Sequence, residues 1–248
     1  MRITFLGTGT AHGVPFIACT CAVCTSKDPR NKRMRSSVYV EYDGRGVLID
    51  ATPDLRTQAL AYGIQRVDAI LLTHSHADHI HGLDDVRIFN FVQKATIPLY
   101  GSKPVLKDVK TRFSYFFKKQ PGWKPQVELK EVNGYFDLFG KTVKPVVVNH
   151  GSQPILGYRI DDFAYLTDCK SLPQESKHKL QGLDILVLNA LRRKEHDTHL
   201  SLDEAIALIE ELCPRRAFIT HMSHDFDHET LCKELPAYIR PAYDGLVL

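Results

Sequence analysis

The chain has 248 residues, of which 44% are apolar and 25% are charged. Its 32 lysines and arginines and 29 acidic residues give a net charge of +3, which excludes a disordered chain and a strongly basic nucleic-acid-coating protein. No run approaches the roughly 20 apolar residues of a membrane span, and the first residues lack a secretory signal pattern. We therefore expect one domain over residues 1–248, cytoplasmic and without a membrane partner.

The first half of the chain alternates between strand and helix patterns. Residues 2–6 form a β-type run that breaks into a turn-rich loop reaching about residue 29. Residues 37–42 and 47–50 predict a hairpin, because the intervening Asp-Gly-Arg-Gly has tight-turn composition. The later predictions are a helix after Pro53, a strand over 68–72, a helix over 84–92, a strand over 97–100 and a helix from 104.

The second half is richer in strands. Turn pairs such as Asn133-Gly134 separate the runs 127–132, 136–139, 141–149, 156–160 and 163–167. A strand over 183–189, a helix over 201–212, a strand over 216–220 and a helix over 228–235 follow. Ser201 is the expected N-cap and Glu204 its capping-box partner. Two β-rich halves, each closed by helices, predict an α/β fold in which two sheets pack face to face with helices outside (αββα).

An aromatic run over 113–117 precedes Lys118 and Lys119, and Pro121-Gly122-Trp123 follows shortly after. We expect core residues joined to a loop here. A flap over a ribose or a base is the alternative.

The segment 74–79 reads His-Ser-His-Ala-Asp-His and follows the apolar run 69–72. A loop at a strand end can turn His74 and His76 toward one point, and Asp78 and His79 toward another a few ångströms away. That arrangement suits two metal ions sharing a site. The alternative is a solvated polar loop that caps the strand.

This motif resembles that of the metallo-β-lactamase superfamily, which implies further ligands downstream. A histidine or aspartate does follow three later apolar runs, as His150, Asp168 and His221. Taken singly, each is also explained as a cap or a hydrogen-bonding residue. The resemblance implies that His74, His76 and His150 hold one metal, that Asp78, His79 and His221 hold the other, and that Asp168 bridges both.

Imidazoles and carboxylates suit zinc or manganese, and affinity order alone does not choose between them. A water shared by two such ions becomes hydroxide near neutral pH, and that hydroxide is the expected nucleophile. Asp78 and His199 are the expected catalytic residues.

Three of the 6 cysteines lie close together as Cys19, Cys21 and Cys24. In a reducing compartment, such spacing favours zinc over disulfides. A tetrahedral site needs a fourth donor, and His224 is the candidate because it lies three residues after His221. We expect a structural zinc knob formed by residues 19–24 with His224. Reduced cysteines without a metal are the alternative.

Several segments together resemble the phosphoribosyl cyclic phosphodiesterase branch of that superfamily, and the resemblance spans essentially the whole chain. They are Gly-Thr-Gly-Thr at 7–10, Gly-Val-Pro at 13–15, the CxCxxC motif, residues 28–33, the late HxxH and residues 241–245. The branch hydrolyses cyclic phosphodiesters. Its relatives among the tRNA 3′-processing endonucleases carry a long Gly/Pro arm, and this sequence contains no such insertion. The implied substrate is a small diester of the phosphoribosyl 1,2-cyclic phosphate or 2′,3′-cyclic nucleotide type.

His199 stands just before the predicted helix over 201–212, where backbone N–H groups favour anions. The resemblance implies that His199 contacts the phosphate and assists the leaving oxygen, whereas simple capping is the structural alternative. His196 lies nearby, and the sequence leaves open which of the two faces the substrate. His12, His81, His178 and His228 are expected at the surface or behind the ligands.

Three other functions stay open. An RNA 3′-end processing nuclease and an acyl or thioester hydrolase share the same metal motif, and a zinc-stabilised binding module would lack turnover. We expect a small phosphodiester as partner, with nucleic acid only as a nucleotide or an RNA end. A homodimer is one alternative for the oligomeric state.

Overall fold

The computed structural model describes residues 1–118 and 122–248. Within these ranges the strands form a six-stranded sheet, in the order β1 to β6, and a seven-stranded sheet, in the order β13 to β7. The first sheet comprises β1 (Arg2–Gly7), β2 (Ser37–Tyr42), β3 (Arg45–Ile49), β4 (Ala69–Leu71), β5 (Ile97–Gly101) and β6 (Val127–Glu131). The second comprises β7 (Phe136–Leu138), β8 (Lys141–His150), β9 (Gln153–Ile160), β10 (Phe163–Leu166), β11 (Ile185–Asn189), β12 (Arg216–Thr220) and β13 (Ile239–Pro241).

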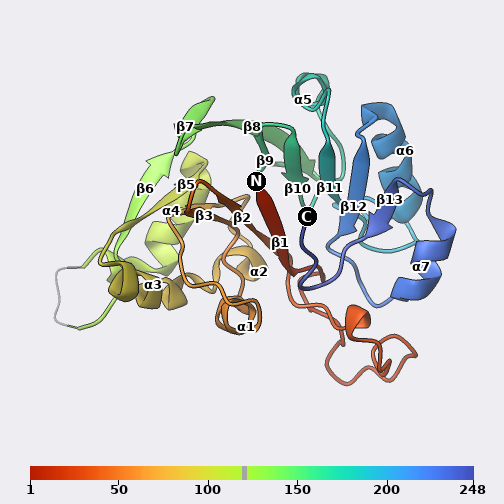
Figure 1. Ribbon diagram of the computed structural model, residues 1–248, viewed down its shortest axis with the longest axis horizontal. Helices are drawn as coiled ribbons and strands as arrows, with labels where there is room; N and C mark the ends of the chain where they lie inside the picture. Colours follow the sequence, from red (N-terminus) through yellow and green to blue (C-terminus); the bar gives the residue numbers. More distant parts are fainter. Residues whose placement is uncertain (119–121) are drawn as a thin grey trace.

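Helices cover the outer face of each sheet (Figure 1). On the first sheet they are α1 (Leu55–Ala61), α2 (Ala77–Ile80), α3 (Val86–Gln93) and α4 (Lys103–Arg112). On the second they are α5 (Gln174–Lys179), α6 (Leu202–Leu212) and α7 (His228–Glu234). The predicted αββα sandwich is therefore confirmed. The capping box of α6 is also present, since Ser201 and Glu204 each accept a hydrogen bond from the other's backbone N–H.

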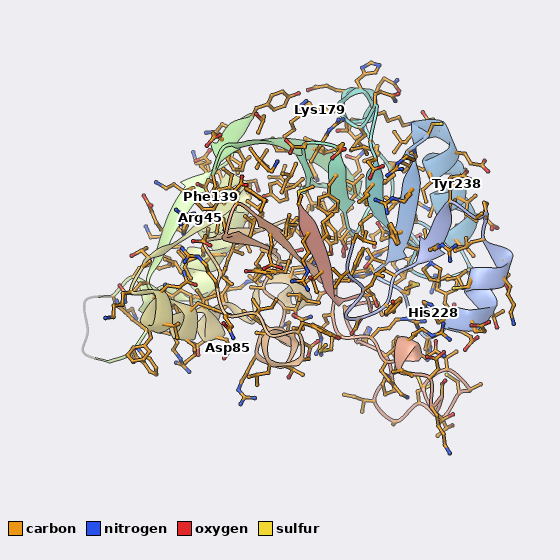
Figure 2. The ribbon with its side chains drawn as sticks, viewed as in Figure 1. Arg45, Asp85, Phe139, Lys179, His228 and Tyr238 are labelled. Carbon is orange, nitrogen blue, oxygen red and sulfur yellow. The ribbon has the colours of Figure 1, made fainter. Side chains whose placement is uncertain are left out.

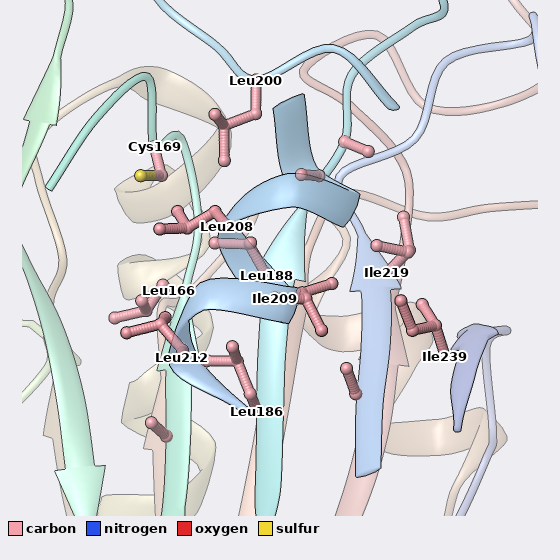
Figure 3. Packing of buried hydrophobic residues seen from close by; sticks show 14 of the residues in the cluster. Leu166, Cys169, Leu186, Leu188, Leu200, Leu208, Ile209, Leu212, Ile219 and Ile239 are labelled. Atoms are coloured by element: carbon pink, nitrogen blue, oxygen red, sulfur yellow. The ribbon is translucent and has the colours of Figure 1, made fainter. Parts of the chain in front are cut away.

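The four layers follow from the alternation of side chains along each strand. In β11, Ile185 and Val187 point into the core between the two sheets. Their neighbours Leu186 and Leu188 belong to the core beneath the outer helices, where α6 packs on the sheet (Figure 3). A third core lies between the first sheet and helices α1, α3 and α4.

Strand direction gathers the ends of several strands at one edge. β10, β11 and β12 run parallel to one another. β8 is antiparallel to β9, which is antiparallel to β10, so β8 runs in the same direction as β10. Polar residues that follow β8, β10 and β12 in the sequence therefore emerge on the same side of the sandwich.

Among the α-helices and strands of the described residues, three differ from the predictions. The helix α2 occupies part of the histidine-rich segment that we expected to be a loop, and α5 and β13 have no counterpart among the predicted elements. All three are short, at 4, 6 and 3 residues, so none spans enough sequence to show a periodic pattern.

The expectation of core residues in the aromatic run holds for Phe113 and Phe116, which lie in the core beneath the first sheet. Trp123 is 59% exposed and packs edge-on against Phe91 of α3. Lys119 and Pro121 lie outside the described residues.

Contacts between distant segments close the sandwich. Arg45 of β3 lies over the ring of Phe139, 5.2 Å from its centroid (Figure 2). The C-terminal segment returns to β1, where Ile3 and Leu248 exchange backbone hydrogen bonds of 3.0 and 2.9 Å. None of the helices in the described ranges is long and apolar enough to span a bilayer.

Asp244 belongs to this returning segment, and its surroundings make the stability of the protein depend on pH. It accepts hydrogen bonds from Thr8 Oγ1 (2.7 Å) and from the backbone N–H of Met34 (2.6 Å), and its burial raises its pKa to about 7. The unfolded carboxyl titrates near 3.9, so the folded protein binds this proton more tightly. The stabilisation is thus present at low pH and is lost as the pH rises through about 7.

We expect wild type to lose about 1 kcal/mol more free energy of unfolding than Asp244→Asn between pH 6 and pH 8, because one proton's linkage is worth about 1.4 kcal/mol per pH unit. Denaturant unfolding at both pH values measures this difference. Parallel pH profiles for the two proteins would contradict the assignment.

Candidate metal centre

The histidines and aspartates singled out in the sequence converge at the strand-end edge. His150 ends β8, Asp168 lies two residues after the end of β10, and His221 follows β12 directly. Asp168 and His221 have φ angles of 54° and 55°, a left-handed conformation uncommon for residues other than glycine. Backbone held in this way is a feature of functional sites, because the surrounding structure must impose it.

Four residues form the first donor group: His74, His76, His150 and Asp168. One donor atom from each lies within 4.8 Å of all the others. His74 Nε2 and His76 Nδ1 are 3.0 Å apart. His150 Nδ1 lies 2.9 Å from the carbonyl oxygens of Asp168 and Thr198, so this nitrogen donates to the backbone and Nε2 is left for the group.

The second donor group consists of Asp78, His79, His221 and Asp168, again within 4.8 Å of one another. His79 Nε2 lies 3.1 Å from Asp78 Oδ2 and 3.3 Å from Asp168 Oδ1. His221 Nε2 is also 3.3 Å from Asp168 Oδ1. The short helix α2 carries both Asp78 and His79.

Asp168 is common to both groups and divides its oxygens between them. Oδ1 faces His79 and His221, while Oδ2 lies 3.8 Å from His74 Nε2. The side chain is 3% exposed. A buried carboxylate with one oxygen toward each donor group has the placement of a bridging ligand.

The separations between the donor atoms are those of ligands around a metal ion. Two ligands about 2.0 Å from one tetrahedral ion lie about 3.3 Å apart, and His79 and His221 keep this separation from Asp168 Oδ1 at 3.3 Å each. Yet the buried Nε2 atoms of His79 and His221 make no hydrogen bond within the described ranges. Buried polar atoms without partners are costly, so these nitrogens call for a bound cation.

The charges in the site offset the cost of burial. Burial alone would raise the pKa of Asp168, but the neighbouring imidazoles of His221 and His79 hold that pKa well below its usual range. Burial likewise favours a raised pKa for Asp78, and again His79 and His221 lower it. Both carboxylates are therefore ionised and available as ligands at neutral pH.

Asp50 orients the second donor group from behind. It lies 2.7 Å from His79 Nδ1 and accepts hydrogen bonds of 2.8 Å from the backbone and hydroxyl of Thr73. The Nδ1 proton of His79 therefore points to Asp50, which leaves Nε2 for the donor group. His81, expected at the surface or behind the ligands, is exposed and lies edge-on to the ring of Phe113.

The structure places His199 nearer the donor groups than His196. His199 Nε2 lies 3.1 Å from Asp168 Oδ2. His196 lies behind it, with Nδ1 3.3 Å from His199 Nδ1 and 3.2 Å from the hydroxyl of Thr198. Burial lowers the pKa of His199 to about 4, so the free enzyme holds a neutral imidazole there at pH 7.

The cysteine knob, residues 19–24, belongs to the long N-terminal loop that projects from the sandwich (Figure 1). Its three sulfurs, of Cys19, Cys21 and Cys24, lie 3.3, 3.6 and 3.4 Å from His224 Nδ1. A sulfur about 2.3 Å and a nitrogen about 2.0 Å from one tetrahedral zinc lie about 3.5 Å apart. The four residues therefore fit a closed Cys₃His site.

The segment 28–33, noted above only as part of a family resemblance, anchors the loop that carries His224. Arg33 is 2% exposed, and its guanidinium donates to the carbonyl oxygens of Phe226 (2.8 Å) and Ser223 (3.4 Å). Asn31 donates to Asp227 at 2.7 Å. Because His221 lies three residues before His224, this anchored loop links the knob to the second donor group.

Both donor groups open into one cavity of about 770 Å³. Residues from each group line it together with His196, His199, Arg192 and Lys194. His12 and Phe16 line it as well. No role for Phe16 is predicted from the sequence, and His12 is expected there only at the surface or behind the ligands, because single rings in an irregular loop show no motif or period.

Comparisons with known proteins agree with this architecture. The family described as the beta-lactamase superfamily domain matches residues 45–222. A crystal structure of a diphosphatase from the PhnP family is 48% identical, with a TM-score of 0.94 over 100% of this chain and 96% of that chain. Zn²⁺-bound PqqB from Methylobacterium extorquens has a TM-score of 0.82 at 21% identity over 100% of this chain and 99% of that one, which supports the fold alone.

An octanoyltransferase of Porphyromonas gingivalis is 40% identical over 99% of this chain. This chain spans only 51% of that protein. The family match, the diphosphatase structure and the grouped histidines and aspartates agree with one another. The chain belongs to the metallo-β-lactamase superfamily of hydrolases, in its PhnP-family branch.

Proposed function

We propose that this protein is a two-metal phosphodiesterase that hydrolyses a small ribose-linked cyclic phosphodiester. The observation that carries the proposal is the pair of donor groups that share Asp168 at the floor of one cavity. Two metals held by these donor groups would suit displacement at phosphorus, because the attacking and leaving oxygens could be stabilised together.

In this proposal His74, His76 and His150 hold one ion, Asp78, His79 and His221 hold the other, and Asp168 contacts both. Zinc and manganese both suit imidazole and carboxylate ligands. When bound, the ions activate water and neutralise charge on the phosphoryl oxygens. A separate zinc, held by Cys19, Cys21, Cys24 and His224, supports the structure.

His199 is the residue that we assign to the phosphate. Its Nε2 lies 3.1 Å from Asp168 Oδ2, both residues line the cavity, and it is the last histidine before α6. A phosphate bound beside the ring brings negative charge, which favours protonation of an imidazole that is neutral in the free enzyme. The ring can then donate a hydrogen bond to the phosphoryl group and a proton to the departing oxygen.

Replacing His199 with asparagine should lower kcat by about 10²- to 10³-fold, within the range of a lost acid–base group. The metal content should not change, because His199 belongs to neither donor group. His196→Asn is the matched variant, and we expect a smaller loss from it since His196 contacts Thr198 and His199 rather than Asp168. Steady-state kinetics with metal analysis tests the order, and a larger loss for His196→Asn would reverse the assignment.

Phosphoanhydride hydrolysis is the second candidate, favoured by the 48% identity to a diphosphatase. The same metals and the same His199 would serve it, with a phosphate as the leaving group. The name octanoyltransferase belongs to a protein of which this chain matches about half, so it supports only the inclusion of an acyl thioester among the substrates tested.

A substrate panel tests the proposal. Purified protein loaded with Mn²⁺ or Zn²⁺ is assayed with bis-p-nitrophenyl phosphate, 2′,3′-cyclic nucleotides, nucleoside diphosphates, S-lactoylglutathione, an octanoyl thioester and a long RNA. We expect the highest kcat/KM on a cyclic phosphodiester. Preference for a diphosphate selects the second candidate, and preference for RNA or a thioester overturns both.

A further inference from the structure

An aromatic wall lines the cavity alongside the donor groups. It consists of His12, Phe16 and His224, all of which line the cavity. The Phe16 and His224 rings are stacked with centroids 4.0 Å apart and planes at 14°. His12 lies 5.1 Å from Phe16, tilted by 41°.

Phe16 is held in place from several directions. Its backbone N–H donates to Cys24 Sγ at 3.3 Å, and its carbonyl accepts from Cys19 at 3.1 Å. Two residues earlier, Val14 exchanges backbone hydrogen bonds of 2.8 Å with the buried Arg33. A side chain fixed in this way loses little conformational entropy on binding, so it is preorganised for a ligand.

The hydrolysis of a phosphoester does not account for this wall. Phe16 has no group that can bind a metal, carry a proton or contact a phosphoryl oxygen. The cavity has about 770 Å³, which is in the range that holds a ligand of drug size, so it has room for much more than the reacting phosphate. A rigid apolar ring beside that space suits another planar ring.

The other lining groups fit an anionic molecule that bears such a ring. Arg192 uses its guanidinium to hold the carbonyl oxygens of Lys194 and Glu195. Lys194 is exposed in the same cavity and forms no ion pair among residues 1–118 and 122–248. One cavity thus combines metal donors for a phosphate, two cationic side chains and an aromatic wall.

We propose that Phe16 is a specificity-determining residue that stacks the base of a nucleotide substrate. This inference rests on the proposed function and narrows it: among ribose-linked phosphoesters, those that carry a base are preferred over those with the sugar alone. The cysteine knob then has a second role besides supporting the structure, since it holds the ring of Phe16 at the cavity.

Two ligands that share the ribose 5-phosphate unit test the inference: AMP and ribose 5-phosphate. Their dissociation constants are measured by calorimetry on the metal-loaded protein, so the readout does not depend on turnover. We expect AMP to bind at least about fivefold more tightly, because base–aromatic stacking contributes about 1–3 kcal/mol per base. Phe16→Leu should bring the ratio of the two constants close to one, and Phe16→Trp should preserve it.

Phe91→Leu is the matched control, since Phe91 is an exposed phenylalanine of α3 that packs against Trp123 and does not line the cavity. It should leave the ratio unchanged. Zinc content and melting temperature separate stacking from support of the knob, because a purely structural role would weaken both ligands equally. Equal affinities in wild type, no detectable binding of either ligand, or an unchanged ratio in Phe16→Leu would each overturn the inference.

The substrate panel tests the proposed function, and its outcome is independent of the binding ratio that tests the Phe16 inference. A protein that hydrolyses no phosphoester but shows the Phe16-dependent ratio refutes the proposed function and keeps the nucleoside subsite. A protein that hydrolyses phosphodiesters but binds AMP no more tightly than ribose 5-phosphate supports the proposed function and refutes the nucleoside subsite.

Discussion

Asp168→Asn is expected to lower kcat/KM for a cyclic phosphodiester by at least about 10³-fold and to reduce the metal content by up to two ions per chain. Loss of an outer partner typically costs about 10- to 100-fold in metal affinity or activity. Loss of the Asp168 carboxylate should lower metal affinity and activity further, because its two oxygens face the two donor groups separately. An amide offers one neutral oxygen in place of two charged ones.

Elemental analysis and steady-state kinetics on the purified variant measure both effects. Asp50→Asn supplies an intermediate case, since Asp50 acts only through His79 and Thr73. Asp203→Asn, an exposed aspartate in the first turn of α6, is the surface control. Full activity with an unchanged metal content in Asp168→Asn would remove the bridging assignment.

Cys24→Ser is expected to release one zinc per chain and to lower the free energy of unfolding by at least about 3 kcal/mol. Structural zinc binding contributes directly to folding, with apparent values of about 10–16 kcal/mol in zinc-finger peptides. Cys24 is the buried cysteine of the knob, and its sulfur also accepts the backbone hydrogen bond of Phe16. The knob should therefore lose its order along with its metal.

Zinc content and denaturant unfolding measure this outcome. Cys232→Ser, in an exposed position of α7, should change neither quantity. The other two metals should still bind to Cys24→Ser, because no cysteine belongs to either His/Asp donor group. Unchanged stability and zinc content would mean that the three cysteines are reduced and bind no metal, as the alternative interpretation has it.

Much of the fold could be predicted because its layers depend on local patterns. The strand β11 alternates between two cores, and an alternation of that kind is visible in the sequence as an apolar run of strand length. The capping box of Ser201 and Glu204 also depends on residues only three positions apart. The short elements α2, α5 and β13 escaped prediction because tertiary packing, rather than periodicity, defines them.

The donor groups were accessible to sequence analysis for a related reason. His74, His76, Asp78 and His79 form one compact motif, and the strand directions then bring single residues such as Asp168 to the same edge. The order of His196 and His199 could not be predicted in this way, because both lie in one loop and their orientations depend on Thr198 and Asp168.

The positions of Phe16 and Arg33 could not be predicted from the sequence. The place of Phe16 at the cavity depends on His224, 208 positions later, and that of Arg33 on carbonyl oxygens at 223 and 226. Neither contact has a local signature. Both become visible only when the N-terminal loop is folded against the loop after β12.

The central claim is that two metals bound by the His/Asp donor groups hydrolyse a phosphodiester. Metal-stripped protein is first supplied with one equivalent of zinc to fill the knob, and Mn²⁺ is then added stepwise while hydrolysis of a 2′,3′-cyclic nucleotide is followed. The account predicts that activity rises until two further equivalents are bound and then levels off. Absence of phosphodiester hydrolysis at saturating metal, or full activity after a single further equivalent, would contradict it.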